Sequence, residues 1–110
     1  MKNFIQRGDV ISAVAPYALA SGDGVKVGAL FGVACSSAAN GAPFELSRYG
    51  VYDLAAVAAD TGSVGAKMYW DDAARKLTTT ATNNILVGCL AQAKANGDTI
   101  AQVLLDGVVR

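Results

Sequence analysis

The amino-acid sequence predicts an all-β fold: a small single-domain β-barrel or β-sandwich with at most one or two short helices. Short segments rich in Val, Leu, Ile and aromatic residues recur at intervals of about 8 to 12 residues, and clusters of Gly, Asn and Asp separate them. No segment offers the long crossover helix that a parallel α/β sheet needs. We therefore expect residues 1–110 to form one β-domain, with residues 1–7 as a possible N-terminal arm.

The first half of the chain is expected to consist of strands that end at turn-forming residues. Residues 10–15 have the composition of a strand, which Pro16 ends because proline has no N–H to donate to a ladder. A turn follows at 21–24, and residues 25–35 are expected to continue as a strand. The nearly unbroken apolar run at 30–34 is typical of a strand that is covered on both faces. Residues 43–46 open the next strand.

The second half is expected to begin after a bend or bulge at Gly50. In the alanine-rich stretch 54–59 a short helix competes with a strand, because Ala is the best helix former. In the last strand Leu104 is expected to face away from its neighbours Val103 and Leu105. The remaining predicted elements are strands at 66–70, 76–80, 85–91 and 100–105, with turns at 71–74, 82–84 and 96–98.

One sequence pattern recurs 56 residues further along the chain. Residues 30–46 comprise an apolar run, a small polar break that ends in Asn-Gly, and a second apolar run, and residues 85–100 follow the same plan. Two copies of one β-unit favour a closed or sandwiched domain, because neither copy buries its apolar face alone. Chance identity in an Ala- and Gly-rich sequence is the alternative. The identical pairs are Gly32/Gly88, Ala39/Ala95, Asn40/Asn96 and Gly41/Gly97.

Composition excludes several functions. Hydrophobic residues make up 53% of the chain, but 21 of them are Ala, so the core is expected to be thin and to gain stability from a partner or from oligomerisation. Nine basic residues balance nine acidic ones without a basic run, so the electrostatic footprint of a nucleic-acid binder is missing. The sequence has no histidine, which is the commonest general base and metal ligand.

One segment near the start of the chain resembles a targeting signal. Lys2 and Arg7 precede an apolar stretch, and residues 18–20 resemble a signal-peptidase site, but Asp9 and Pro16 interrupt the pattern. No stretch approaches the roughly 20 apolar residues that span a bilayer, so a membrane partner is not expected.

Cys35 and Cys89 stand alone and far apart, without the spacing of a zinc site. We expect two small buried residues, with a disulfide or an exposed thiol as alternatives. Neither the cysteines nor Ser36 have a histidine partner that would activate a nucleophile.

Two further segments have some of the residues of a ligand-binding site. The Gly-rich stretch 22–28 lacks the spacing of a phosphate-binding loop, because Lys26 precedes its last glycine and a strand follows. Asp71 and Asp72 beside Trp70 suggest a metal or sugar site, but a solvated hairpin turn next to a core aromatic residue fits better. We predict no catalytic, cofactor-binding or metal-binding residues and no small-molecule substrate.

A series of short motifs runs through almost the whole length of the chain, at residues 3–6, 8–10, 16, 21–22, 30–34, 41, 49–54, 65–71, 87–88, 97–98 and 103–105. In the order and spacing of these motifs the chain resembles the family of small tailed-phage capsid cement, or head decoration, proteins. Cys89 and Leu90 depart from the resemblance, since smaller residues are expected there.

The resemblance implies a non-enzymatic virion protein of a phage or prophage that binds the capsid exterior and stabilises it. It also implies the major capsid protein as partner, a homotrimer, and synthesis in the host bacterial cytoplasm. A tail or baseplate β-domain, a small ligand- or carbohydrate-binding β-module, and an enzyme or enzyme accessory are the alternatives. The candidate capsid contact is the N-terminal segment with its apolar Phe4 and Ile5, although an edge strand explains the same residues. Its members are Asn3, Phe4, Ile5, Gln6 and Arg7.

Overall fold

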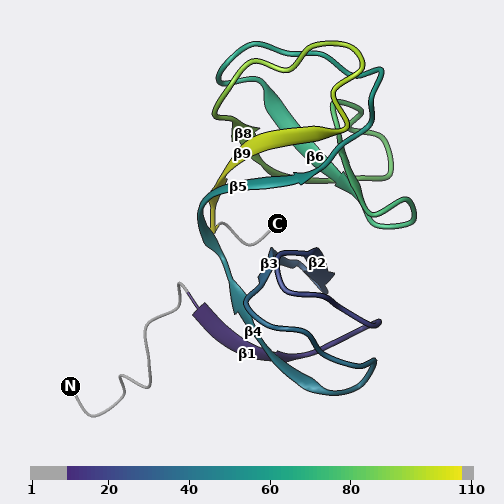
Figure 1. Cartoon of the computed structure of the whole chain (residues 1–110), viewed down its shortest axis with the longest axis vertical. Coiled ribbons are helices and arrows are strands. Elements are labelled where there is room, and N and C mark those ends of the chain that lie inside the picture. The colour runs from purple at the N-terminus through teal and green to yellow at the C-terminus, as the bar shows by residue number, and fades with distance from the viewer. Residues whose placement is uncertain (1–9, 108–110) are drawn as a thin grey trace, which may run out of the picture.

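The computed structural model describes residues 10–107, which form two antiparallel sheets arranged one above the other along the long axis (Figure 1). No helix occurs within this range, and the described strands do not close into a barrel. The predicted all-β class is confirmed, and the arrangement is sandwich-like. The strands are β1 (Val10–Val14), β2 (Gly24–Val27), β3 (Leu30–Ala34), β4 (Pro43–Ser47), β5 (Tyr49–Ala55), β6 (Lys67–Asp71), β7 (Lys76–Thr78), β8 (Ile85–Leu90) and β9 (Ile100–Asp106).

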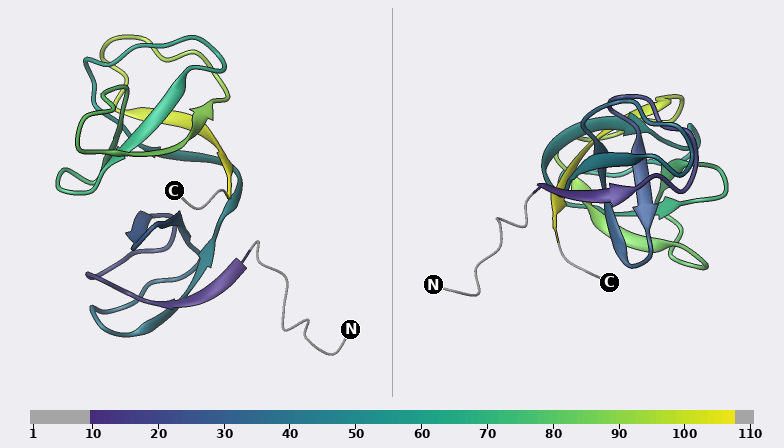
Figure 2. Two further views of the ribbon diagram at one scale, coloured as in Figure 1. Left: turned by 180° about the vertical axis from the view of Figure 1, so that it is seen from behind. Right: turned by 90° about the horizontal axis from the view of Figure 1, so that it is seen from below.

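The first four strands form the N-terminal sheet, in the order β1-β4-β3-β2, and the other five form the C-terminal sheet, in the order β5-β9-β8-β6-β7. Strands β4 and β5 are separated only by Arg48, so the backbone passes from one sheet directly into the other (Figures 1 and 2). Gly50, two residues further on, has a φ of 123°, which confirms the predicted bend.

The two sheets are copies of one unit. Strands β1, β2, β3 and β4 correspond in order and pairing to β5, β6, β8 and β9, while β7 is an addition in the second copy. The loop hydrogen bonds repeat as well: the Gly41 N–H donates to the Ala15 carbonyl, and the Gly97 N–H donates to the Ala58 carbonyl. The internal repeat predicted from the sequence is therefore confirmed.

The repeat explains the shared glycines. Gly41 and Gly97 have φ values of 85° and 100°, a region that side chains rarely adopt. Gly32 and Gly88 lie where two strands approach closely: a Cβ atom would be 2.4 Å from the Ser47 carbonyl oxygen at the first and 2.0 Å from the Leu104 carbonyl oxygen at the second. These four positions require glycine for the backbone geometry.

The structure decides one alternative that the sequence left open and corrects one prediction. Residues 54–59 form no helix, because Ala55 pairs with Ile100 in the sheet and the Ala56 N–H donates to the Thr99 carbonyl. The stretch 25–35 is not one strand but a hairpin, because Gly28 takes a φ of 60° and reverses the chain between β2 and β3. The expectation that β3 is covered on both faces is confirmed, since Phe31, Val33 and Ala34 are all buried.

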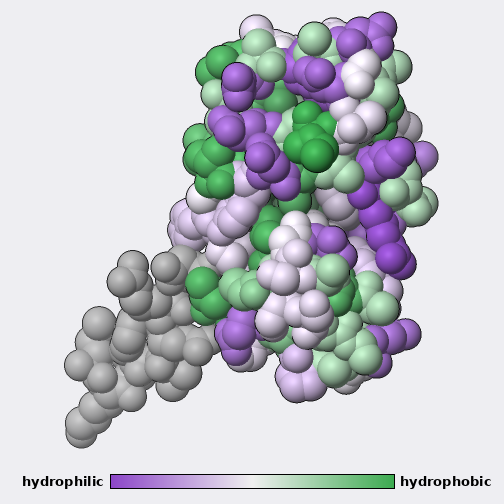
Figure 3. Space-filling model, in the orientation of Figure 1, coloured by the Kyte–Doolittle hydropathy of each residue, from purple (hydrophilic) through white to green (hydrophobic). Residues whose placement is uncertain are grey.

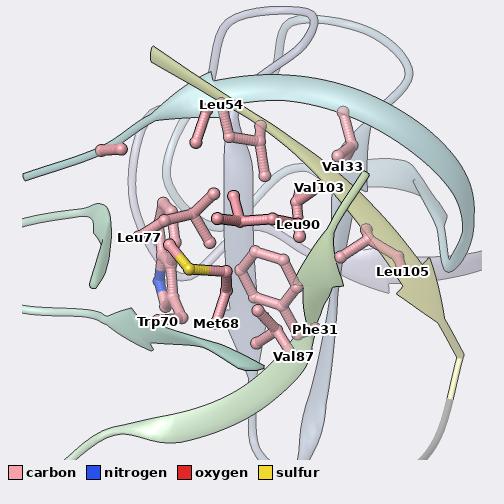
Figure 4. Close-up of a cluster of buried hydrophobic side chains, with 12 residues drawn as sticks. Phe31, Val33, Leu54, Met68, Trp70, Leu77, Val87, Leu90, Val103 and Leu105 are labelled. Carbon is pink, nitrogen blue, oxygen red and sulfur yellow. The ribbon is translucent and has the colours of Figure 1, made fainter. Parts of the chain in front are cut away.

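Each sheet has a core, and β3 contributes to both. In the N-terminal core Val25, Ala34, Phe44 and Leu46 pack with Ala15 and Leu19. The C-terminal core is larger and includes Phe31 and Val33 from the N-terminal sheet (Figure 4). The other buried members of that core are Leu54, Ala56, Met68, Trp70, Leu77, Val87, Leu90, Ala101, Val103 and Leu105.

Polar contacts also join the two sheets. The Tyr17 hydroxyl donates to the Asp72 carboxylate over 3.2 Å, and the Arg75 guanidinium lies 3.6 Å from the centre of the Tyr17 ring. Burial, and then the neighbouring Asp72 carboxylate, raise the pKa of Tyr17, so this hydroxyl keeps its proton. The Arg48 guanidinium donates to the Gly107 carbonyl at the crossing point. These contacts hold the two sheets together as one body.

Candidate interaction surface

The segment predicted to contact a partner, residues 3–7, lies outside the described residues. The other candidates can be placed. Trp70 is 2% exposed and packs on Phe31 with ring centres 4.9 Å apart, so it belongs to the core and offers no stacking platform for a sugar.

Asp71 and Asp72 lie in the β6–β7 hairpin, as predicted. The Asp71 carboxylate accepts hydrogen bonds from the Ala73 and Ala74 N–H groups, which fixes the turn. The Asp72 carboxylate accepts a bond from the Trp70 indole over 3.1 Å in addition to the bond from Tyr17. Both carboxylates therefore have structural partners. No group of three or more possible metal ligands occurs in the described part of the chain.

The cysteines are not paired with each other, and the expectation that both are buried was wrong. Cys35 is exposed where it follows the end of β3, and Cys89 is partly exposed on β8. Ser36 is exposed next to Cys35. Between Val10 and Gly107 no helix is long and apolar enough to cross a membrane.

A cleft of about 610 Å³ lies between the two sheets. The β2–β3 turn forms one wall with Gly28 and Ala29, while Tyr69 and Leu86 belong to the opposite wall. Its polar lining consists of Lys26, Asp72 and the amides Asn83 and Asn84. These side chains provide no base and nucleophile pair, so the cleft has no recognisable chemistry.

A second surface is apolar and faces outward. We call it the outer face: the row of Val51, Leu104, Cys89 and Lys67, which are paired neighbours across β5, β9, β8 and β6. Val51 and Leu104 are 53% and 44% exposed, although they lie in the middle of regular strands. Exposed large side chains next to one another on a sheet are a feature of interaction sites.

The outer face is hollowed beside Leu104. A depression of about 300 Å³ there is lined by Lys67, Leu86, Gly88, Cys89, Leu104 and Asp106. In the view of Figure 3 apolar residues lie in separate patches among polar ones, so no single extended apolar surface covers that side of the molecule.

The corresponding face of the N-terminal sheet is partly covered. There the paired row is Val10, Ser47, Val33 and Gly24. Val33 is 5% exposed, and a Cβ atom on Gly24 would be 2.8 Å from the Trp70 ring, so the C-terminal core packs directly against this end of the row, while Val10 at the other end is 40% exposed. The positions on β3 and β2 are thus buried in the first copy, whereas their counterparts Cys89 and Lys67 in the second copy are not.

A buried lysine in the second copy is a local stabilising feature. The Lys94 ammonium donates to the carbonyls of Asp60, Ala58 and Ala95 over 2.6, 3.3 and 3.4 Å. Nearby, the hydrogen bond from the Thr78 hydroxyl lowers the pKa of Asp60, with the Thr79 N–H as a further donor. In the first copy Ala38 takes the place of Lys94, in the same bridging pattern.

The outer face was not predicted from the sequence. The signal was present in β9, where Leu104 was correctly expected to face away from Val103 and Leu105. A large apolar residue on the side of the strand that it shares with Gln102 was the available indication. Val51 and Cys89 could not be added, because their pairing with Leu104 depends on contacts between distant strands.

The comparisons with known proteins give one match. The model of a family described as phage cement protein matches residues 5–105. Neither the search of curated proteins nor the search of solved structures found a match.

Proposed function

Because the chain belongs to the phage cement protein family, we propose that it binds the exterior of a phage or prophage capsid and stabilises the shell without catalysing a reaction. The family match over residues 5–105 is the observation that carries this proposal. At the coarser level, membership makes the chain a capsid-associated structural protein of a phage. The partner that we propose is the major capsid protein, and the form that we propose is a homotrimer.

The shape and chemistry of the described residues support a bracing role. The two sheets share a core and polar contacts, and the body measures 48 × 32 × 23 Å. A rigid body that contacts several capsid subunits restrains their movement, and several weak contacts made together bind much more tightly than one alone. We propose that such a cement acts through contact area and multiplicity.

The alternatives from the sequence have less support. A carbohydrate-binding module would need an exposed aromatic platform, and Trp70 is buried. Asp71 and Asp72 have structural partners in the β6–β7 hairpin, and Ser36 and Cys35 have no histidine to activate them, since the sequence contains none. A tail or baseplate role differs from a capsid role in the particle that is bound, so binding to isolated particles decides between them.

The experiment is to mix the purified full-length protein with expanded, undecorated heads of the phage and with isolated tails, and to sediment each mixture. We expect saturable binding to heads, no binding to tails, and disruption of the decorated heads at a higher temperature. Heads that already carry their cement protein are the control for specific sites. Binding to tails alone, or binding to heads without any gain in heat resistance, contradicts the proposal.

For the segment 3–7 we keep the capsid contact as a proposal from the sequence, because Phe4 and Ile5 are apolar residues that a solvated tail does not need. Deleting residues 1–6 and measuring both thermal stability and binding to heads tests it. Loss of binding with stability unchanged supports the contact. Loss of both in step shows that the segment is part of the fold.

A further inference from the structure

The four edge strands of the two sheets are β1, β2, β5 and β7, and β1 differs from the others in charge. An edge strand has backbone N–H and C=O groups that a foreign strand can bind, and a charged side chain on the strand opposes such pairing. Strands β2, β5 and β7 carry Lys26, Asp53 and Lys76, whereas β1 carries no charged residue. Within residues 10–107, β1 is therefore the edge strand that has no charge of its own to prevent pairing.

The direction of the backbone groups on β1 follows from its pairing with β4. The Ala15 N–H donates to the Ala42 carbonyl, so the backbone groups of Ala15 point toward β4. Because this direction alternates along a strand in an antiparallel ladder, the groups of Val10, Ser12 and Val14 point away from β4. No other strand in the described part of the chain pairs with β1 on that side.

The side chains at this edge are exposed and mainly apolar. Val10 and Val14 are 40% and 60% exposed. Between them, the Ser12 hydroxyl donates to the Glu45 carboxylate on β4 over 2.9 Å, which engages the carboxylate within the sheet. The edge of β1 thus combines outward hydrogen-bonding groups with an uncharged row of side chains, which suits an added strand with apolar residues.

The second copy of the fold protects the equivalent edge, that of β5. Asp53 takes the position of Ser12, since each lies three residues before the residue that bonds to the loop ahead of its partner strand. Further along, the Val57 N–H donates to the Leu77 carbonyl of β7, which closes that end of the edge. The first copy has Pro16 in place of Val57, and proline has no N–H to donate. The two copies therefore differ at this edge as a protected strand and an open one.

We propose that the outward edge of β1 accepts an extended segment of the capsid protein as an additional strand, with apolar side chains of that segment beside Val10 and Val14. The inference rests on the proposed capsid binding and specifies how the contact is made. Backbone hydrogen bonds provide the attachment, and the side chains that alternate along the added strand provide the fit.

A capsid segment fits this edge better than a second copy of the chain does. Pairing two β1 edges about a two-fold axis makes a dimer and leaves no edge for a third copy, whereas the form proposed above is a homotrimer. Pairing β1 with another edge of a neighbouring copy meets the charges on β2, β5 or β7. In the sequence, β1 also follows closely on residues 3–7, for which a capsid contact is already proposed.

A proline at the middle of β1 tests the outward edge alone. Ser12→Pro removes an N–H that points away from β4 and places a ring where the added strand would lie, while the ladder with β4 keeps its donors. Ser12→Ala is the matched control, because it also loses the hydroxyl but keeps the N–H. We expect Ser12→Pro to bind expanded, undecorated heads at least about tenfold more weakly than Ser12→Ala in the sedimentation assay. Thermal unfolding of the free variants verifies that both are folded.

A second pair of variants decides the question if proline disturbs the strand itself. Val14→Lys puts a charge on the edge of β1, and Val51→Lys puts the same charge at a similarly exposed position of β5. We expect Val14→Lys to weaken binding to heads and Val51→Lys to leave it unchanged. Equal binding by the two lysine variants, or full binding by a folded Ser12→Pro, overturns the added strand and leaves capsid binding itself intact.

Hydrogen exchange gives a readout in the unmodified full-length protein. On binding to heads, amides of residues 10–14 should exchange more slowly, while those of residues 51–53 should not change. Binding without protection of β1 overturns the inference alone. Protection of β1 that appears in the free protein as its concentration rises assigns the edge to a second copy and also overturns it. A protein that does not bind heads at all overturns the proposed function, and the inference with it.

Discussion

The two sheets have the same backbone plan and different interiors. The N-terminal unit fills its own core, with Phe44 and Leu46 packed among Leu19, Val25 and two alanines. At the position of Phe44 the C-terminal unit has Ala101, and its core is completed by Phe31 and Val33 from the other unit. The comparison teaches that glycines and loop hydrogen bonds define this unit, while its side chains are free to differ. It also shows that one unit is completed by the other, and the reverse does not hold.

The largest effect should come from the glycines that both units share. Gly88→Ala places a Cβ atom 2.0 Å from the Leu104 carbonyl oxygen, and Gly32→Ala places one 2.4 Å from that of Ser47. Because two backbones must move apart, we expect losses in the free energy of unfolding on the order of 4 kcal/mol, larger at Gly88 than at Gly32, measured by chemical denaturation.

Gly41→Ala is the matched control for the glycine variants. An alanine at position 41 must adopt the positive φ of Gly41, but no atom lies within 4 Å of its Cβ. The backbone strain alone should reduce the free energy of unfolding by about 1 kcal/mol. If Gly88→Ala costs no more than this control, the two units do not depend on the close approach of their strands.

The next effect tests which unit depends on the other. Phe31→Ala should reduce the free energy of unfolding by about 3 to 4 kcal/mol, because it opens a cavity beside Trp70. Hydrogen exchange should then show loss of protection in β6 and β8, although Phe31 belongs to the N-terminal sheet.

Phe44→Ala is the counterpart in the N-terminal core. It should cost a similar amount but lower protection in β1 to β4 first. The comparison of the two cores fails if Phe31→Ala loosens the N-terminal sheet alone.

A smaller effect is expected at Lys94, which belongs to the second unit alone. Lys94→Met keeps most of the buried side-chain volume but leaves the carbonyls of Ala58, Asp60 and Ala95 without their charged donor. We expect a loss of about 2 kcal/mol in the free energy of unfolding. Lys76→Met, at an exposed position of β7, is the control and should change stability by less than about 0.5 kcal/mol. Equal effects at the two lysines would show that the buried ammonium has no special role.

The smallest effect is a dependence on pH. The pKa of Asp60 is lower in the folded protein than in the unfolded chain, mainly because of the Thr78 hydroxyl. The carboxylate therefore stabilises the fold above its ordinary pKa, and this contribution is lost as the pH falls through the lowered value. Thr78→Val should make urea stability less sensitive to acid, while Thr80→Val should not. An unchanged acid profile in Thr78→Val would assign the sensitivity to other carboxylates.

Much of this fold follows from local sequence signals. Turns at Asn40-Gly41 and Asn96-Gly97 were predicted, because those residues accept positive φ, and the repeat was found from the same residues. The choice between helix and strand at residues 54–59, which the sequence left open, shows why local signals are not enough. Alanine at 55 and 56 favours a helix locally, but pairing with β9, almost fifty residues later in the chain, decides for a strand.

The candidate site was less predictable than the fold. Leu104 was assigned to the correct side of its strand, but a site consists of neighbours, and those of Leu104 come from β5 and β8. The apolar run of β3 predicted that Val33 is covered, but which residues cover Val33, and why Cys89 stays partly exposed, depends on how the two units pack. The predicted contact at residues 3–7 lies outside the described residues and stays a prediction.

The single crossing of the chain at Arg48 has a consequence for synthesis. Residues 10–47 contain every strand of the first sheet, so this sheet is complete before the second has left the ribosome. Until β6 and β8 have been synthesised, Phe31 and Val33 are exposed to water. The nascent chain therefore has an apolar surface that is buried in the folded protein. Crowded polysomes therefore bring together the nascent chains that are most prone to aggregate, and slow translation after Arg48 would lower the yield of soluble protein.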